Sequence, residues 1–89
     1  MKRPKLTDTD IAHAYAKAAI YAQPVMLRVD GTEKAARRAI IQAVCRGHVE
    51  HSGDPERGWL TEAGIDLLEP EIQEQYRAAV RGKTLMRAG

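Results

Sequence analysis

The chain has 89 residues, a formal net charge of +2 and a single cysteine. A chain of this length forms one domain with a modest core, which leaves little room for a deep catalytic cleft, so we expect a binding protein and not an enzyme. One cysteine excludes an internal disulfide, no apolar run is long enough to cross a bilayer, and no apolar signal segment follows MKRPKL. We therefore expect a cytoplasmic protein that acts without a membrane.

Charge is distributed unevenly along the chain. Basic residues gather near both ends and in the segment 34–46, whereas between residues 47 and 76 the acidic residues are opposed by Arg57 alone. The acidic residues of that segment are Glu50, Asp54, Glu56, Glu62, Asp66, Glu69, Glu71 and Glu74. A dipolar surface of this kind can steer a partner of either sign to one face.

The first predicted element is a helix from Asp8 to Ala22. Capping residues and first-turn acids open it, and Gln23 and Pro24 end it, since proline lacks the N–H that a helix interior needs. Apolar residues recur at three- and four-residue steps, and many are alanines, so the helix is thin and a neighbour can approach it closely. We interpret it as a packed core element; a homodimer through this helix is also compatible with the pattern.

A short strand and a basic helix come next. Residues 25–29 form an apolar run with β-branched ends, which favours an edge strand. Asp30 and Gly31 then turn the chain, Thr32 is a suitable N-cap and Gly47 a suitable left-handed C-cap, so a helix is predicted between them. The predicted buried stripe of this helix is Ala36, Ala39, Ile40, Ala43 and Val44.

Residues 48–51 and 58–61 are predicted to pair as antiparallel strands. The turn formers at 52–57 make a connection longer than a tight hairpin turn. Because side chains alternate along a strand, Val49 should face inward together with either Trp59 or Leu60.

Two helices complete the predicted chain. Thr61 caps a short one, and Pro70 starts the last, which we expect to close at Gly82. We expect residues 1–6 and 83–89 to be flexible. The predicted core comprises Ile11, Tyr15, Ala18, Leu27, Ala36, Ile40, Val44, Val49, Leu60, Ile65, Leu68, Ile72 and Tyr76.

The order helix, hairpin, helix within residues 39–68 resembles the second half of a winged-helix domain. The matching residues are Gly47, Val49 and Glu50 in a G-x-V-E strand, and Leu60, Thr61 and Gly64 in an L-T-x-x-G segment. The resemblance implies an α+β, winged-helix-like fold with the order α-β-α-β-β-α-α. It also implies a DNA-binding helix directly before the hairpin, which in this family is called the wing.

The helix before the wing is accordingly the candidate nucleic-acid interface. Its basic and polar side chains suit phosphates and base edges, because arginine or lysine can pair with guanine and glutamine with adenine. The candidate residues are Lys34, Arg37, Arg38 and Gln42. We therefore expect a non-enzymatic DNA-binding regulator or accessory protein whose partner is duplex DNA.

A second hypothesis is protein binding. Residues 25–31 leave no room for the helix that normally precedes a recognition helix, and an acidic wing would repel phosphate. An acidic wing and the helix after it would instead suit a basic protein partner. The candidate residues are Asp54, Glu56, Glu62, Asp66 and Glu69. By analogy, small inhibitors of the anti-CRISPR type occur on phages and mobile elements. Either charged surface is also compatible with an ordinary solvated helix face.

Neither a metal site nor a catalytic site is expected. Cys45, His48 and His51 are spaced three apart, but structural zinc needs a fourth ligand and the two histidines would point to opposite faces of a strand. Cys45 lies near the C-terminal end of a helix, where the negative end of the helix dipole disfavours a thiolate. We expect Cys45 to lie in the core. The acids Asp66, Glu69 and Glu74 lie where helices need charge for solubility. We expect no cofactor.

Overall fold

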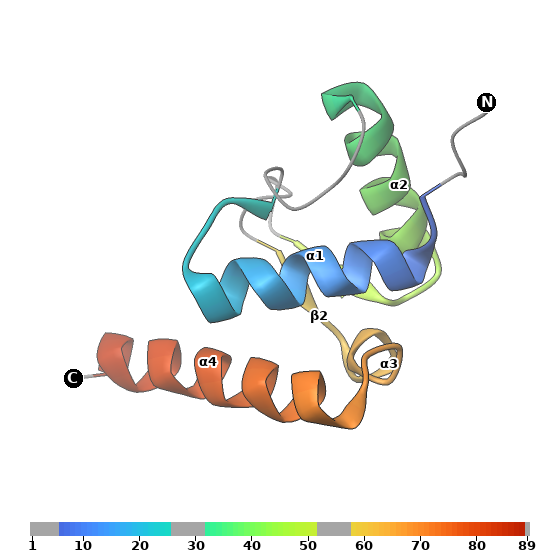
Figure 1. Cartoon of the computed structure of the whole chain (residues 1–89). Coiled ribbons are helices and arrows are strands. Elements are labelled where there is room, and N and C mark those ends of the chain that lie inside the picture. The colour runs from blue at the N-terminus through green and yellow to red at the C-terminus, as the bar shows by residue number, and fades with distance from the viewer. Residues whose placement is uncertain (1–5, 26–31, 52–57, 89) are drawn as a thin grey trace.

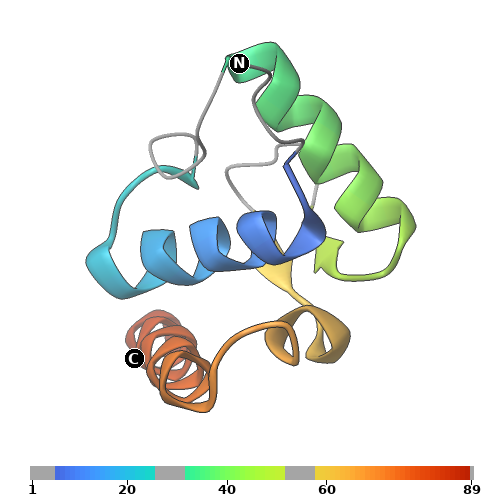
Figure 2. The same ribbon diagram turned by 45° about the vertical axis from the view of Figure 1, so that its right-hand side comes forward.

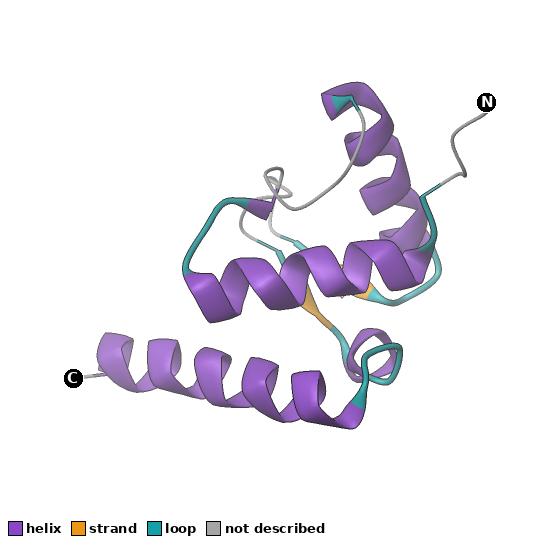
Figure 3. Cartoon of the chain, viewed as in Figure 1, coloured by secondary structure: helices purple, strands orange, loops and turns teal. Residues whose placement is uncertain are grey.

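Four helices and a two-stranded antiparallel sheet make up the described part of the computed structural model, which comprises residues 6–25, 32–51 and 58–88. This architecture confirms the predicted α+β class (Figure 3). In chain order the elements are α1 (Asp8–Tyr21), α2 (Glu33–Cys45), β1 (Val49–Glu50), β2 (Trp59–Leu60), α3 (Glu62–Ile65) and α4 (Pro70–Ala88).

Helix α1 lies at the centre of the molecule. It passes between α2 on one side and α4 on the other (Figures 1 and 2), and it also contacts α3 and β2. Four of its alanines are buried, and they point to several sides of the helix: Ala12, Ala14, Ala16 and Ala18. Small side chains let all of these neighbours approach the same helix. These four alanines are therefore covered by other elements of the chain.

The ends of α1 and α2 follow the predicted capping residues. At α1, the hydroxyl of Thr7 accepts the Asp10 backbone N–H at 3.2 Å and the Asp10 carboxylate accepts the Thr7 N–H at 2.9 Å, which completes a capping box. The helix ends at Ala22 in the left-handed conformation. Thr32 caps the start of α2. Gly47 lies just beyond the end of α2 and has a φ of 79°. Both helices are confirmed to within a residue.

The residues on either side of the predicted turn do pair as an antiparallel hairpin. Val49 lies opposite Leu60 and Glu50 opposite Trp59. Val49 and Leu60 are buried, whereas the Trp59 side of the strand faces solvent. The turn at residues 52–57 lies outside the described residues. The predicted inward pair is thus Val49 with Leu60.

A tight junction joins the hairpin to α3. The Thr61 hydroxyl donates a hydrogen bond to the Gly47 carbonyl at 2.5 Å and accepts one from the Gly64 N–H at 3.1 Å. The Thr61 N–H donates to the His48 carbonyl at 3.1 Å. Gly64 packs so closely that a Cβ atom there would collide with the same carbonyl. The spacing of the L-T-x-x-G segment therefore has a direct structural reason in this chain.

The hydrophobic core contains most of the predicted residues. Val44 and Ile72 are only partly buried, and Leu27 lies outside the described residues. The hydroxyl of buried Tyr76 accepts the Leu60 N–H at 2.9 Å, which links α4 to the hairpin. The predicted core residues that are buried are Ile11, Tyr15, Ala18, Ala36, Ile40, Val49, Leu60, Ile65, Leu68 and Tyr76.

Two predictions are wrong, and a third is tested in only one residue. Helix α4 does not close at Gly82 but runs to Ala88, since a glycine inside a helix costs only about 1 kcal/mol. Cys45 is exposed and not in the core, because it lies about 200° around α2 from buried Ala43. Of the strand predicted at 25–29, only Val25 is described, and it is buried in a helical turn.

We predict that Gly64→Ala destabilises the protein by about 3 kcal/mol or more, because the new Cβ would overpack against backbone that cannot move aside cheaply. Helix propensity alone predicts the opposite, a gain of about 1 kcal/mol. Urea denaturation followed by circular dichroism measures the difference. Ala63→Gly, at an exposed position in the same helix, serves as the control and should cost at most about 1 kcal/mol. A Gly64→Ala variant as stable as the parent would refute the close packing of α3 on His48.

Candidate nucleic-acid interface

Helix α2 has one buried face and one free face. Ala36, Ala39, Ile40 and Ala43 are buried in the core. Because successive residues are about 100° apart around a helix, positions 34, 37, 38 and 42 fall on the opposite side. All four of these side chains, Lys34, Arg37, Arg38 and Gln42, are exposed. The structure thus brings the sequence-predicted DNA-binding residues together on one open surface, which we call the α2 outer face.

The cations of the α2 outer face have few partners among the described residues. Arg37 lies 3.6 Å from Glu33 one turn earlier, and both side chains are more than half exposed. An exposed pair of this kind contributes about 0.3–0.5 kcal/mol at most, so it does not withhold Arg37 from a stronger partner. In the described part of the chain, neither Lys34 nor Arg38 forms an ion pair.

Two further residues belong to the α2 outer face, and the sequence analysis did not assign them there. Ile41 has 57% of its surface exposed, and Cys45 is exposed as well. Ile41 lies seven residues after Lys34 and three after Arg38. Cys45 lies seven residues after Arg38 and four after Ile41. Steps of three, four and seven residues keep side chains on one helix face. That spacing is present in the sequence, although the sequence predicts a core position for Cys45 and assigns Ile41 no role.

The C-terminal end of α2 is fixed to the start of α1 by one carboxylate. Asp8 accepts a hydrogen bond from Arg46 at 2.7 Å and contacts His48 Nδ1 at 2.5 Å. Its side chain is only 12% exposed, and charge-assisted contacts are strong when they are shielded from water. The contact orients α2 relative to α1, and it also commits Arg46, a cation that the sequence alone leaves free.

The acidic residues of the second hypothesis are placed differently. Glu62 forms two hydrogen bonds with Arg77, at 2.8 and 3.0 Å, and these bonds with the guanidinium lower the pKa of its carboxyl. Glu69 contacts His13, whose hydrogen bond likewise lowers the pKa of the Glu69 carboxyl. Asp66 is exposed. Asp54 and Glu56 lie outside the described residues.

The residues weighed as metal ligands do not form a cluster. Cys45 is exposed at the end of α2, His48 is partly buried beside Asp8, and His51 is partly buried after β1. Within residues 6–25, 32–51 and 58–88, no three histidine, cysteine or acidic side chains are close enough together to hold a metal ion.

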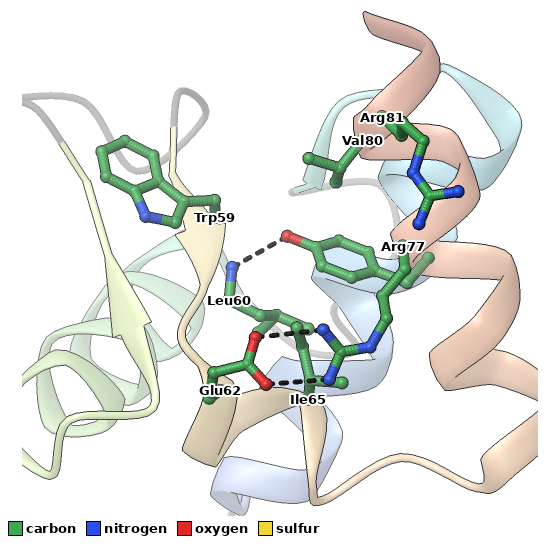
Figure 4. A pocket seen from close by; sticks show the side chains of 8 residues that line it. Trp59, Leu60, Glu62, Ile65, Arg77, Val80 and Arg81 are labelled. Atoms are coloured by element: carbon green, nitrogen blue, oxygen red, sulfur yellow. Dashed lines mark hydrogen bonds and ion pairs between the residues drawn. The ribbon is translucent and has the colours of Figure 1, made fainter. Parts of the chain in front are cut away.

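A groove of about 330 Å³ lies between β2 and α4, on a different part of the surface from α2 (Figure 4). Leu60, Ile65 and Tyr76 supply its apolar lining, and Trp59 and Val80 border it with exposed apolar surface. The ion pair between Glu62 and Arg77 crosses one side of the groove, and Arg81 lies near the other (Figure 4).

Comparison with known proteins identifies no relative of this chain. No family model, no curated protein and no solved structure matches the chain. Among the described residues, no helix has both the length and the apolar content that crossing a membrane requires.

His13 connects α1 to the start of α4. Its Nε2 lies 3.0 Å from Glu69 and its Nδ1 lies 2.8 Å from the Thr9 carbonyl. Both partners are acceptors, so a ring that carries both protons satisfies them best. Partial burial by itself lowers the pKa of His13, but the hydrogen bonds to Glu69 and Thr9 and the charge of Glu69 outweigh it and raise the pKa above the ordinary 6.5.

This contact makes stability depend on pH. A histidine with a raised pKa in the folded state stabilises most at pH values below the ordinary 6.5, and its contribution is lost as the pH rises through the folded pKa. We predict that the melting temperature falls as the pH rises from about 6 to 8, and that His13→Gln removes this slope. Thermal melts at several pH values measure it. Glu69→Gln should flatten the slope too, whereas Glu74→Gln, at an exposed position on α4, should leave it unchanged.

Proposed function

We propose that the chain is a non-enzymatic DNA-binding regulator or accessory protein of the winged-helix type, and that α2 is its recognition helix. The observation that carries the proposal is the α2 outer face, where Lys34, Arg37, Arg38 and Gln42 are all exposed while the opposite side of the helix is buried in the core. No catalytic step is part of the proposal.

The dimensions of α2 suit a major groove. Thirteen residues make a helix of about 20 Å, and the groove of B-form DNA admits a single helix. Three cations on the exposed side match phosphates or guanine edges, and Gln42 matches adenine. The hairpin follows α2 directly, in the place that the wing has in the family, and α1 supports the buried side of the helix (Figure 2).

Protein binding through acidic residues remains the second candidate, and the described acids favour it less. A basic partner would have to displace Arg77 from Glu62 and His13 from Glu69. Asp66 is the one described candidate acid that forms no ion pair with another described residue. Among the described ion pairs, binding through the α2 outer face would displace only the weak pair between Arg37 and Glu33.

We predict that the protein binds duplex DNA with an affinity that falls steeply with salt, since each phosphate contact releases a counterion. Arg37→Glu with Arg38→Glu should weaken binding at least about 100-fold and lower the salt slope by about 2. Fluorescence anisotropy with a labelled duplex measures both quantities.

The matched control is Lys17→Glu with Arg81→Glu. It changes the net charge by the same amount at exposed positions outside α2, and it should retain most of the affinity. If both double variants lose affinity equally, binding depends on net charge and not on α2. If the parent protein does not bind DNA even at low salt, the DNA-binding proposal is wrong. Retention of a basic protein partner that Asp66→Lys abolishes would then support the second candidate.

The single cysteine provides a test of placement. Cys45 is exposed on the α2 outer face, so an iron chelate attached to its sulfur should cleave bound DNA. A control with Cys45→Ser and Lys17→Cys carries the same chelate on α1, and we predict that it cleaves at least about tenfold less, because radical cleavage is local and α2, not α1, lies in the groove. Sequencing gels of end-labelled duplex measure the cleavage. Equal cleavage from both positions would contradict the proposed orientation.

A further inference from the structure

An isoleucine lies near the middle of the basic face of α2. Ile41 is 57% exposed and does not belong to the hydrophobic core of the described residues. On the same face its neighbours are Arg37 and Arg38 on the preceding turn and Cys45 on the following one. A single exposed apolar residue is ordinary on a protein surface. Its position here, one turn after Arg37 and Arg38 and next to Gln42, gives it a specific consequence if α2 enters DNA.

The major groove presents one apolar group, the 5-methyl of thymine. A branched aliphatic side chain on a groove-facing surface has no other apolar partner among the base edges. Gln42 is the next residue on the helix and is also exposed, and a glutamine can pair with the adenine edge in the same groove. Ile41 therefore matches the thymine methyl and Gln42 the adenine edge, which are two of the features that A·T pairs display there.

We propose that Ile41 is a specificity-determining residue that contacts the thymine methyl, and that the part of the DNA site facing the middle of α2 contains A·T pairs. This inference rests on the proposed function, since it requires α2 to lie in the major groove. Arg37, Arg38 and Lys34 supply affinity through phosphate or guanine contacts, whereas Ile41 distinguishes thymine from bases that lack the methyl.

The test compares two duplexes that differ only in that methyl. One is an alternating A·T duplex of about two helical turns; the other has deoxyuridine in place of every thymine. Shielding one methyl-sized group from water corresponds to a preference of about fourfold. We expect the parent protein to bind the thymine duplex about fourfold more tightly, as measured by anisotropy at fixed salt.

The variants assign the preference to one side chain. Ile41→Ala should bind both duplexes equally and retain the salt slope of the parent, because the phosphate-binding cations are unchanged. Ile41→Val, which keeps a branched side chain, should retain part of the preference. Glu74→Gln, at an exposed position on α4 outside the α2 outer face, should retain all of it. Thermal melts confirm that each variant is folded, as expected for changes at exposed positions.

The possible failures are distinguishable. Equal binding of the two duplexes by the parent protein overturns the inference on Ile41 and leaves the proposed function standing. A preference that survives Ile41→Ala also overturns it, because another group would then read the methyl. Absence of binding to either duplex at low salt overturns both the inference and the proposed function.

Discussion

The rest of the structure depends on the burial of one thin helix. Helix α1 is covered by α2, by β2 and α3, and by α4, and its alanines are small enough for these neighbours to pack against it from several directions. A bulkier residue at Ala12 or Ala16 would push a neighbouring element away, since protein interiors have few voids that could absorb the added volume. In a chain of 89 residues, such a shared central helix is an economical way to form a core.

Two polar contacts then set the orientation of the elements around α1. Asp8 links the start of α1 to the end of α2 through Arg46 and to the segment before β1 through His48. Thr61 binds the Gly47 carbonyl and, together with Gly64, holds α3 against the start of the hairpin. The outcome is a basic helix with a supported inner side and an open outer side, which is the geometry that rigid recognition of a partner requires.

The charged side chains of the molecule differ in whether they form ion pairs within the described part of the chain. The cations of the α2 outer face have either no described partner or a weak one within the same helix. Two of the acids that follow the hairpin have partners within the chain, since Glu62 pairs with Arg77 and Glu69 contacts His13. Lys34, Arg37 and Arg38 are therefore accessible in the described structure, and exposed Ile41 adds apolar surface to the same face.

Local sequence determined the helices and the hairpin, because capping residues, periodicity and glycine act within a few residues of one another. Thr7, Thr32 and Thr61 each cap the helix predicted for them, and Val49 faces inward as the alternation requires. The tertiary structure decided what depends on distant partners. Asp8 engages Arg46, Glu62 engages Arg77 and Glu69 engages His13, and residues far apart in sequence leave no local signal of such pairing. Helical spacing groups Cys45 and Ile41 with the basic residues, but only packing decides that this face is uncovered, since an apolar residue in a helix is buried only where a neighbouring element covers it.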